Sequence, residues 1–410
     1  MTTEAPARFN PFSAEFRRDP YPMYRGLRET RPVHKTMGMW VLTRHSDVRA
    51  ALLDRSLSAG LIPELVSKNA SRLSDVSVDK IERLGEKSLV FTDNPLHARL
   101  RGLVNRVFTP QAIAGLRPRI AEVAGQLVKR ALTDGEMDAV TDFAAPLPLT
   151  VMCDWMALPP SLRGQVGRWT HDVRFLLEPG LMTTEDFARV SQAVEAFAGT
   201  LSELVTERRA RPGDDLVSQL ACAVTAGGDR LSDEEVIFVC IMSFVAGNET
   251  TKSLIGNGLL ALLRHPEQSA LLRGRPGLLK SAVDEALRYD CPLQMTKRLA
   301  TRDIEIGGKQ VRAGEQLLLC LGAANRDPEA FDRPDDFDIA RDARTHLSFG
   351  HGMHGCLGGL LAQLQAEIAF GCLYSETARL DLAAEQLEWQ DHSLIVRGLR
   401  HLPVSLHGAR

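Results

Sequence analysis

The chain has 410 residues, too many for a simple binding module and suitable for one large enzyme or two ordinary domains. Its 49 basic and 52 acidic residues give a formal net charge of −3, which excludes the strong basic field that binds a nucleic-acid backbone or an anionic membrane. Hydrophobic residues make up 44% and charged residues 25%, as in folded proteins rather than disordered ones.

The seven cysteines are scattered and never form a C-x-x-C pair, which favours reduced thiols over a disulfide framework or a closed zinc site. The N-terminal sequence has no apolar core typical of a signal peptide. The longest unbroken apolar run, Val236–Met242, is far shorter than the roughly 20 residues that cross a bilayer. We therefore expect a cytoplasmic protein without a membrane anchor.

In chain order, residues 33–42, with Met37-Gly38 inside, predict a β-hairpin. From about Ser46 to Tyr289, apolar residues recur at three- and four-residue spacing, which predicts a succession of helices. Further strands are expected at 303–306, 316–321, 394–396 and 402–404. The fold class is therefore mainly α with a smaller β-sheet region built from both ends of the chain. No linker divides residues 1–410, so we expect a single domain.

Two segments have weak periodicity. Residues 58–88 are rich in Ser, Asp and Lys, and Glu178-Pro179-Gly180 interrupts a helical region. Either segment could be a lid, but a surface loop is the simpler expectation.

Residues 349–359 read FGHGMHGCLGG, with five glycines among eleven residues. Such a turn has unusual backbone angles or a group packed closely against the main chain. After Cys356, leucines recur at helical spacing, so this cysteine is expected at a helix N-terminus. Amides and the helix dipole there favour a thiolate, which is a nucleophile or a metal ligand.

Three interpretations of this turn compete. Cys356 could be a buried structural cysteine beside a tight turn. It could bind a transition metal together with His351 and His354, although no fourth donor is evident. Alternatively, it could be the single axial thiolate of a haem, with the glycines letting the flat macrocycle approach the backbone.

The sequence F-G-H-G-M-H-G-C-L-G resembles the haem-binding loop of the cytochrome P450 family, the haem-thiolate monooxygenases. The resemblance implies that Cys356 is the axial iron ligand of haem b and that Phe349 and Gly358 help to bind the cofactor. It also implies the family fold, a triangular helical body around the haem. Gln363 and Gln365 stand where bacterial members often have Arg and Glu, a change expected to affect surface or partner contacts rather than haem binding.

A capping box at Ser232–Glu235 opens an apolar helix expected to continue to about Arg264. Its middle reads AGNETT, and burying an acid and hydroxyls there costs about 1–3 kcal/mol per unsatisfied group. The simplest explanation is contact with water or mutual hydrogen bonds. The segment also resembles the family's oxygen-activation motif, which implies that Gly247 leaves room for dioxygen, and that Thr250 and Glu249 relay protons. Asn248 departs from that motif.

A haem carries two propionates, which call for cationic donors from separate parts of the chain. The segment DNPLHARLR resembles a family motif and places His97 and Arg101 on one helix face. By the same resemblance, Arg298 and His354 complete the propionate contacts. Glu285 and Arg288 match the family's E-x-x-R pair, with a structural role on the cysteine side of the haem.

The resemblance covers essentially the whole chain and implies a monooxygenase of secondary metabolism that inserts one oxygen atom of O2 into an apolar small molecule. The substrate could be bound to a carrier protein, and its pocket is expected to include Val245, Met295 and Leu394. Electrons would come from a separate ferredoxin or flavodoxin and its reductase. The enzyme itself is expected to be a monomer. Two alternatives stay open: a peroxide-driven peroxygenase on the same scaffold, and a haem sensor without catalysis.

Overall fold

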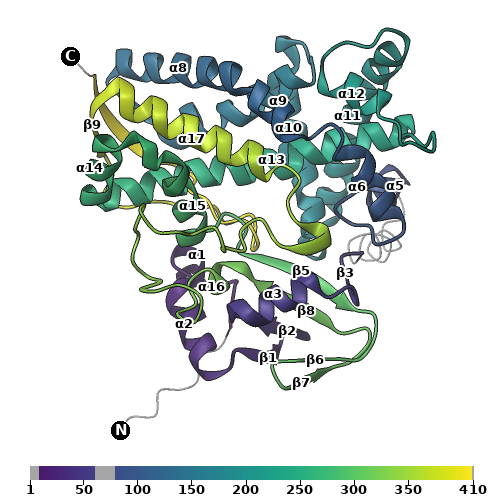
Figure 1. Ribbon diagram of the computed structural model, residues 1–410, viewed down its shortest axis with the longest axis horizontal. Helices are drawn as coiled ribbons and strands as arrows, with labels where there is room; N and C mark the ends of the chain where they lie inside the picture. The colour runs from purple at the N-terminus through teal and green to yellow at the C-terminus, as the bar shows by residue number, and fades with distance from the viewer. Residues whose placement is uncertain (1–8, 61–78, 409–410) are drawn as a thin grey trace. The chain divides into compact units, whose positions relative to one another are not determined.

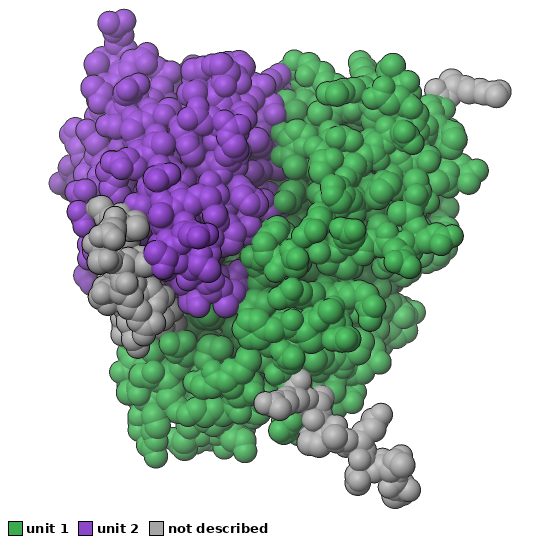
Figure 2. Space-filling model, turned by 180° about the vertical axis from the view of Figure 1, so that it is seen from behind, with its two compact units in different colours: residues 1–58, 121–146, 250–410 green, residues 59–120, 147–249 purple. Residues whose placement is uncertain are grey.

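A computed structural model describes residues 9–60 and 79–408 of the chain (Figure 1). The chain divides into two compact units (Figure 2). Unit 1 comprises residues 1–58, 121–146 and 250–410, and unit 2 comprises residues 59–120 and 147–249. The expectation of one catalytic domain over residues 1–410 stays a prediction. Among the described residues, no helix combines the length and low polarity that a bilayer crossing needs.

Unit 1 contains every strand of the described residues, together with seven α-helices that lie wholly within it. The helices are α1 (Ala14–Arg18), α2 (Tyr21–Thr30), α3 (His45–Leu53), α14 (Pro266–Gly274), α15 (Leu279–Tyr289), α16 (Leu321–Ala324) and α17 (Gly359–Glu376), with a π-helical turn at Ala139–Ala144. The strands are β1 (Val33–Thr36), β2 (Met39–Leu42), β3 (Leu57–Ser58), β4 (Glu136–Asp138), β5 (Met295–Ala300), β6 (Ile304–Ile306), β7 (Lys309–Val311), β8 (Gln316–Cys320), β9 (Thr377–Leu382) and β10 (Pro403–Gly408).

Strands from both ends of the chain meet in the largest sheet, whose order is β1-β2-β8-β5-β3. β2 and β8 run parallel, and the other neighbours are antiparallel. A second sheet has the order β4-β10-β9, and β6 and β7 form a separate hairpin. The prediction of a mainly helical fold with a smaller sheet region is confirmed.

The two hairpins follow from their turn residues. Met37 and Gly38 have φ values of 49° and 75°, and Gly307 and Gly308 have values of 55° and 72°. Two successive residues with positive φ form the turn type whose twist matches that of paired strands. The hairpin predicted at residues 33–42 and the strands predicted at 303–306 and 316–321 are therefore confirmed, within one residue at their ends.

The strand predicted at residues 394–396 is wrong. The Ser393 hydroxyl accepts hydrogen bonds from the backbone N–H groups of Ile395 and Val396, at 3.3 and 2.9 Å. A side chain that takes up successive backbone donors in this way forms a local turn and competes with a strand ladder. Only one isolated bridge, between Val396 and Leu293, remains there. The last predicted strand, at 402–404, is β10, which begins at Pro403.

Unit 2 is helical, and two long helices run from one unit into the other. Its own helices are α5 (Asp79–Lys87), α6 (Leu96–Val104), α7 (Pro110–Gly115), α9 (Pro146–Trp155, which begins on the last residue of unit 1), α10 (Arg163–Val173), α11 (Thr184–Ala210) and α12 (Leu216–Cys222). The helices shared by the units are α8 (Arg117–Asp134) and α13 (Asp233–Arg264).

The two segments with weak periodicity have different outcomes. Residues 61–78 of the first lie outside the described residues, and α5 begins at Asp79. The second forms two short 3-10 turns, Arg174–Leu177 and Pro179–Leu181. Glu178, between them, is only 8% exposed and Pro179 is buried, whereas Gly180 and Leu181 are exposed, so only the end of this segment lies on the surface.

α13 begins and ends where the sequence predicts. The Ser232 hydroxyl accepts a hydrogen bond from the Glu235 N–H at 3.2 Å, and the Glu235 carboxylate accepts one from the Ser232 N–H at 2.8 Å. These reciprocal bonds satisfy donors that a helix N-terminus otherwise leaves without partners. The helix then runs to Arg264.

A fully buried ion pair on α15 holds the chain that leads to the cysteine turn. The Arg288 guanidinium donates to both carboxylate oxygens of Glu285, at 2.7 and 2.8 Å, and neither side chain is exposed. Arg288 also donates to the backbone carbonyls of Asn325, Pro334 and Asp336, at 3.1, 2.7 and 2.9 Å. The pair therefore fixes two separate points of the chain between α16 and α17.

We predict that Glu285→Gln lowers the free energy of unfolding by about 3–5 kcal/mol, because it leaves the buried Arg288 without its counter-charge. Chemical denaturation of the purified protein measures this loss. Asp303→Asn is the matched control, since Asp303 pairs with Arg312 on the surface, where the side chains are 52% and 68% exposed. A loss no larger for Glu285→Gln than for Asp303→Asn would contradict a structural role for the buried pair.

Candidate functional site

Cys356 lies at the end of the glycine-rich turn in unit 1 and precedes α17. Cys356 is exposed, and its backbone N–H donates to the Phe349 carbonyl at 2.8 Å. Gly350 and Gly352 have positive φ values of 65° and 72°, which other residues rarely adopt. The α17 helix begins at Gly359, three residues after the cysteine. The predicted position of Cys356 in front of a helix is therefore correct.

Close backbone packing explains two glycines of the turn. A Cβ atom on Gly352 would lie 3.0 Å from the Leu52 carbonyl oxygen, and one on Gly355 would lie 3.2 Å from the Gly352 carbonyl oxygen. A Cβ on Gly359 would contact the Phe349 ring at 3.4 Å, so this ring packs on the first turn of α17. Around Gly358, in contrast, a Cβ would meet nothing within 4 Å. The turn is therefore closely packed at Gly352 and Gly355, and open at Gly358, two residues after the cysteine.

The donors present in the turn fit a haem better than a zinc ion. In the described residues, no three His, Cys, Asp or Glu side chains come together as metal ligands, which removes the site formed by His351, His354 and Cys356. The first interpretation, a buried structural cysteine, conflicts with the exposure of Cys356. One exposed thiol on an open glycine turn is what a single axial thiolate ligand requires.

The polar middle of α13 interrupts an otherwise buried helix. Val245 is 1% exposed, but the next residue, Ala246, is exposed, and a Cβ on Gly247 would meet nothing within 4 Å. Glu249 and Thr250 follow and are partly buried. The open position at Ala246 and Gly247 agrees with the predicted role of Gly247 in leaving room beside the helix.

Asn248 remains the unusual residue of this segment. Its Oδ1 atom is buried and has no hydrogen-bond partner among the described residues. A buried acceptor without a partner costs free energy unless a ligand or water satisfies it. Asn248 therefore offers an acceptor next to Glu249, a feature that the sequence pattern alone identified only as a departure.

In unit 2, α6 carries the predicted pair His97 and Arg101. His97 is 2% exposed, and burial, with the nearby Arg101 cation as a second cause, lowers the pKa of its imidazole. Between them, Arg99 donates to Asp229 at 2.9 Å and to Glu235 at 2.7 Å. Because Glu235 belongs to the capping box of α13, Arg99 ties α6 to the start of that helix.

The other predicted cationic groups lie in unit 1. Arg298 on β5 is 7% exposed, and it donates to the Thr296 hydroxyl at 3.2 Å and to the Lys297 carbonyl at 2.7 Å. His354 ends a single 3-10 turn, Gly352–His354, inside the cysteine turn. The four predicted propionate contacts thus divide evenly between the two units.

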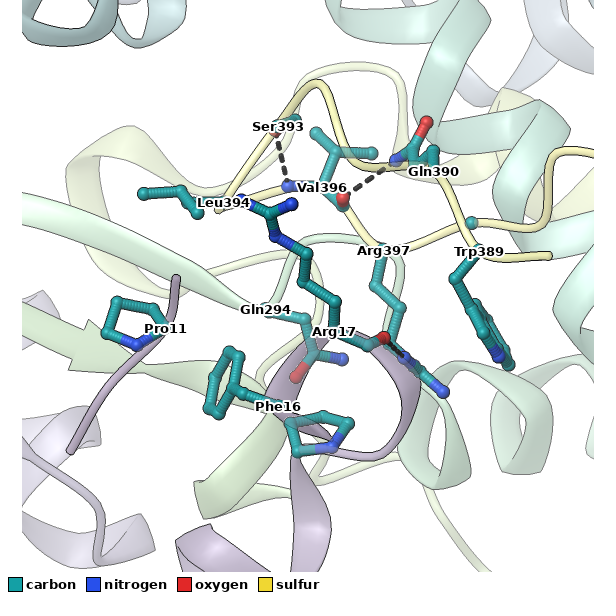
Figure 3. A pocket seen from close by; sticks show the side chains of 12 residues that line it. Pro11, Phe16, Arg17, Gln294, Trp389, Gln390, Ser393, Leu394, Val396 and Arg397 are labelled. Atoms are coloured by element: carbon teal, nitrogen blue, oxygen red, sulfur yellow. Dashed lines mark hydrogen bonds between the residues drawn. The ribbon is translucent and has the colours of Figure 1, made fainter. Parts of the chain in front are cut away.

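The residues predicted for the substrate pocket have different surroundings. Met295 is 1% exposed and packs in a core cluster with Val41 and Leu318. Leu394 lines a small, half-open pocket in unit 1, which Figure 3 shows between the turn that carries Ser393 and the segment of Arg17. The roles of Met295, Leu394 and Val245 in substrate binding stay predictions.

The glutamines after the cysteine lie on α17 as expected, but they face the protein interior. Gln365 is 2% exposed, and Gln363 donates to the Asp284 carboxylate at 2.5 Å. Burial raises the pKa of Asp284, which is 5% exposed. The expectation that this change concerns surface or partner contacts is therefore wrong for the buried Gln365, whereas for the partly exposed Gln363 it stays a prediction.

The sequence reasoning missed a buried cation in unit 2. Arg174 is 7% exposed and stacks on the Phe175 ring, with 4.3 Å between its guanidinium carbon and the ring centroid. Burial lowers the pKa of Arg174, and the negative charge of Glu249 opposes this shift. An arginine inside an apolar pattern has no sequence signal of burial, so only the folded chain identifies it.

Comparison with known proteins gives a consistent match. The family model named Cytochrome P450 matches residues 172–274 and 277–376. Vitamin D(3) 25-hydroxylase of Pseudonocardia autotrophica is 36% identical and aligns over 99% of this chain and 98% of its own. The 6-deoxyerythronolide B hydroxylase of Saccharopolyspora erythraea is 36% identical over 97% of this chain and 98% of its own.

A solved structure extends this match to the fold. P450BioI, crystallised with an acyl carrier protein that carries hexadec-9Z-enoic acid, is 34% identical to this chain and has a TM-score of 0.87. The match covers 96% of this chain and 99% of that one.

Proposed function

The chain belongs to the cytochrome P450 family, and we propose from this premise which of its own residues carry out the reaction. The protein is a haem-thiolate monooxygenase with haem b as its cofactor. When bound, the haem supplies the activation of O2, of which one atom enters an apolar organic substrate and the other is reduced to water. The observation that carries the residue assignments is the exposed Cys356 at the end of the glycine-rich turn.

We assign Cys356 as the axial iron ligand. The hydrogen bond from its backbone N–H to the Phe349 carbonyl fixes the cysteine relative to α17, and the Phe349 ring packs on Gly359. Gly358, around which a Cβ would meet nothing, leaves the macrocycle room at the start of the helix. A soft thiolate in this position tunes the electron density of a bound iron.

The cationic groups fit the two carboxylates of the cofactor. By the family motifs, Arg298 on β5, His354 in the cysteine turn, and His97 and Arg101 on α6 would contact the propionates. Arginine pairs with a carboxylate through parallel N–H donors, which adds orientation to charge neutralisation. Burial and Arg101 lower the pKa of His97, and the negative charge of a nearby propionate would oppose this shift, so the ring would donate an N–H to that carboxylate.

The middle of α13 would supply the protons that the reaction at the bound cofactor consumes. Reduction of the second oxygen atom to water consumes two protons, which must enter a site otherwise kept dry. The Thr250 hydroxyl can accept and donate a proton at the same oxygen, and the Glu249 carboxylate can exchange protons with solvent. Gly247 leaves space beside the helix for the reacting oxygen.

We also propose that residues 1–410 act as one catalytic domain and as a monomer. Electrons would come from a separate ferredoxin or flavodoxin and its reductase. All seven cysteines are free thiols, which supports a reducing compartment such as the bacterial cytoplasm. The alternatives of a peroxide-driven peroxygenase and of a sensor are less favourable, because the Glu249-Thr250 pair is present and would serve neither.

The substrate class is an apolar molecule of medium or large size, and we propose that a carrier protein presents it. The support comes from P450BioI, whose crystal structure contains an acyl chain ligated to its carrier. A carrier adds a protein contact to the contacts that the apolar chain makes inside the pocket. The hydroxylases of vitamin D(3) and 6-deoxyerythronolide B represent the free-substrate alternative.

We predict that Cys356→Ser abolishes the thiolate spectrum, because a serine hydroxyl stays protonated where a cysteine ionises. The reduced carbon monoxide complex should absorb near 420 nm instead of about 450 nm. Cys372→Ser is the control, since Cys372 is a free thiol further along α17. A band near 450 nm that survives in the Cys356 variant would remove this residue as the ligand.

We predict that Thr250→Ala lowers the amount of product per electron consumed by about tenfold or more, because the variant loses a proton donor. Product and hydrogen peroxide are measured together in a system with ferredoxin and its reductase. Thr250→Ser should retain coupling. Thr251→Ala, at a neighbouring residue that is 1% exposed, is the control for packing. Full coupling in Thr250→Ala would contradict the relay assignment.

The carrier proposal predicts that an acyl chain bound to a carrier protein binds more tightly than the same free acid, by about tenfold or more. Titration that follows the low-spin to high-spin optical shift measures both affinities. The unloaded carrier serves as the control and should give no shift. Equal affinities for the free and the carrier-bound acid would indicate a free substrate instead.

A further inference from the structure

The side chain of Asn325 connects α16 to the start of the cysteine turn. Asn325 is the C-cap residue of α16, and it is fully buried. Its Oδ1 atom accepts a hydrogen bond from the Leu347 N–H at 2.7 Å, and its Nδ2 atom donates to the Ser348 hydroxyl at 2.8 Å. One amide group thus contacts two consecutive residues that lie 22 and 23 positions further along the chain.

Ser348 continues this connection to α15. Its hydroxyl donates to the Leu287 carbonyl at 2.7 Å, so that the oxygen both accepts from Asn325 and donates to the helix. Leu287 directly precedes Arg288, whose guanidinium donates to the Asn325 carbonyl at 3.1 Å. Side chain and backbone of Asn325 are therefore held to the same end of α15.

The backbone of Ser348 has a further fixed partner. Its N–H donates to Nδ1 of His346 at 3.2 Å, which requires that this nitrogen carries no proton. Burial lowers the pKa of His346 to about 4, so the ring is neutral near pH 7 and can accept. The side chains of His346 and Ser348 therefore each have a fixed hydrogen-bonding role. His346 accepts through Nδ1, and the Ser348 hydroxyl accepts from Asn325 and donates to Leu287.

Phe349 connects this hydrogen-bonded segment to Cys356. It follows Ser348 directly, its carbonyl accepts the hydrogen bond from the Cys356 N–H at 2.8 Å, and its ring packs on Gly359. Between Ser348 and Phe349 there is a single peptide bond, which is planar and stiff. A shift of Ser348 therefore moves the Cα atom of Phe349, to which the carbonyl that accepts from Cys356 and the ring that packs on Gly359 are both attached.

We propose that Asn325 is a positioning residue for the iron-binding thiolate, acting through Leu347 and Ser348 on the Phe349 carbonyl and so on Cys356. This inference rests on the proposed role of Cys356 as the axial ligand. Asparagine suits the position because it supplies an acceptor and a donor from one rigid, uncharged plane. Aspartate lacks the donor and would bury a charge, and leucine lacks both groups.

The test compares two buried asparagines. Asn325→Ala removes the two hydrogen bonds to Leu347 and Ser348. The matched control is Asn257→Ala: Asn257 is 1% exposed, and its Nδ2 atom donates to the carbonyls of Asp290 and Arg397 at 3.3 and 3.2 Å. Both variants lose two bonds of one buried amide, but only the first loses contacts with the segment that precedes Phe349.

The readouts are the share of the reduced carbon monoxide complex that absorbs near 450 rather than 420 nm, and the reduction potential of the iron. Each is measured on haem-loaded protein at an equal distance below the thermal midpoint of each variant, which removes general loss of stability. We expect Asn325→Ala to lose at least half of the 450 nm band and to shift the potential. Asn257→Ala should keep both at the values of the unaltered protein.

Ser348→Ala is the second variant and decides the matter if Asn325→Ala does not fold, because it removes the hydroxyl alone and should lose part of the band. An undiminished 450 nm band and potential in the folded Asn325 variant, or in Ser348→Ala where the Asn325 variant does not fold, would overturn the proposal. So would an equal loss in Asn257→Ala. An unaltered protein that never shows the 450 nm band would instead refute the assignment of Cys356.

Discussion

The rest of the site depends on the chain between α16 and α17. This stretch must position Cys356 accurately, although it contains almost no regular secondary structure. From Asn325 to Gly358 the described chain forms turns and one 3-10 turn, and no strand or longer helix. Turns pair only some backbone groups of such a stretch, as where the Gly350 N–H donates to the Leu347 carbonyl at 2.8 Å, and buried groups without partners are costly. Side chains therefore have to supply the missing donors and acceptors.

Arginines supply most of the missing donors. Arg288 contributes bonds to three carbonyls of the stretch, and Arg341 donates to the carbonyls of Asp332 and Arg333. Both guanidiniums also contact the Glu285 carboxylate, which is fully buried. A buried pair contributes little net stability by itself, because desolvation offsets the attraction. Here its importance is geometric, since five N–H groups in a rigid fork can fix several points of a chain.

The sequence predicts the parts of the fold that follow from local chemistry. The turns at Met37-Gly38 and Gly307-Gly308 and the capping box of α13 were predictable because each depends on adjacent residues. β5 and β9 were not predicted, since Lys297, Arg298, Arg379 and Asp381 interrupt the alternation of apolar residues. The turn at Ser393 replaces a strand because a side chain competes for the backbone donors. In the site, the cysteine turn and the motif on α13 are visible in the sequence. The hydrogen bonds of the Asn325 side chain with Leu347 and Ser348, in contrast, join residues that are distant in the sequence.

This difference also explains why the reaction class is easier to infer than the substrate. The groups assigned to the cofactor occur in short motifs with fixed spacing, and dense hydrogen bonding on the cysteine side restrains their backbone. The segments expected around the substrate have restraints of their own: Ser393 accepts from two backbone N–H groups of the turn that carries Leu394, the Gln390 amide donates to the Val396 carbonyl, and two 3-10 turns form most of residues 174–181. These restraints are separate from those of the cysteine turn, so the segments can change sequence without disturbing it. Their shape, including the burial of Arg174, is set by packing against the rest of unit 2, which no local pattern encodes.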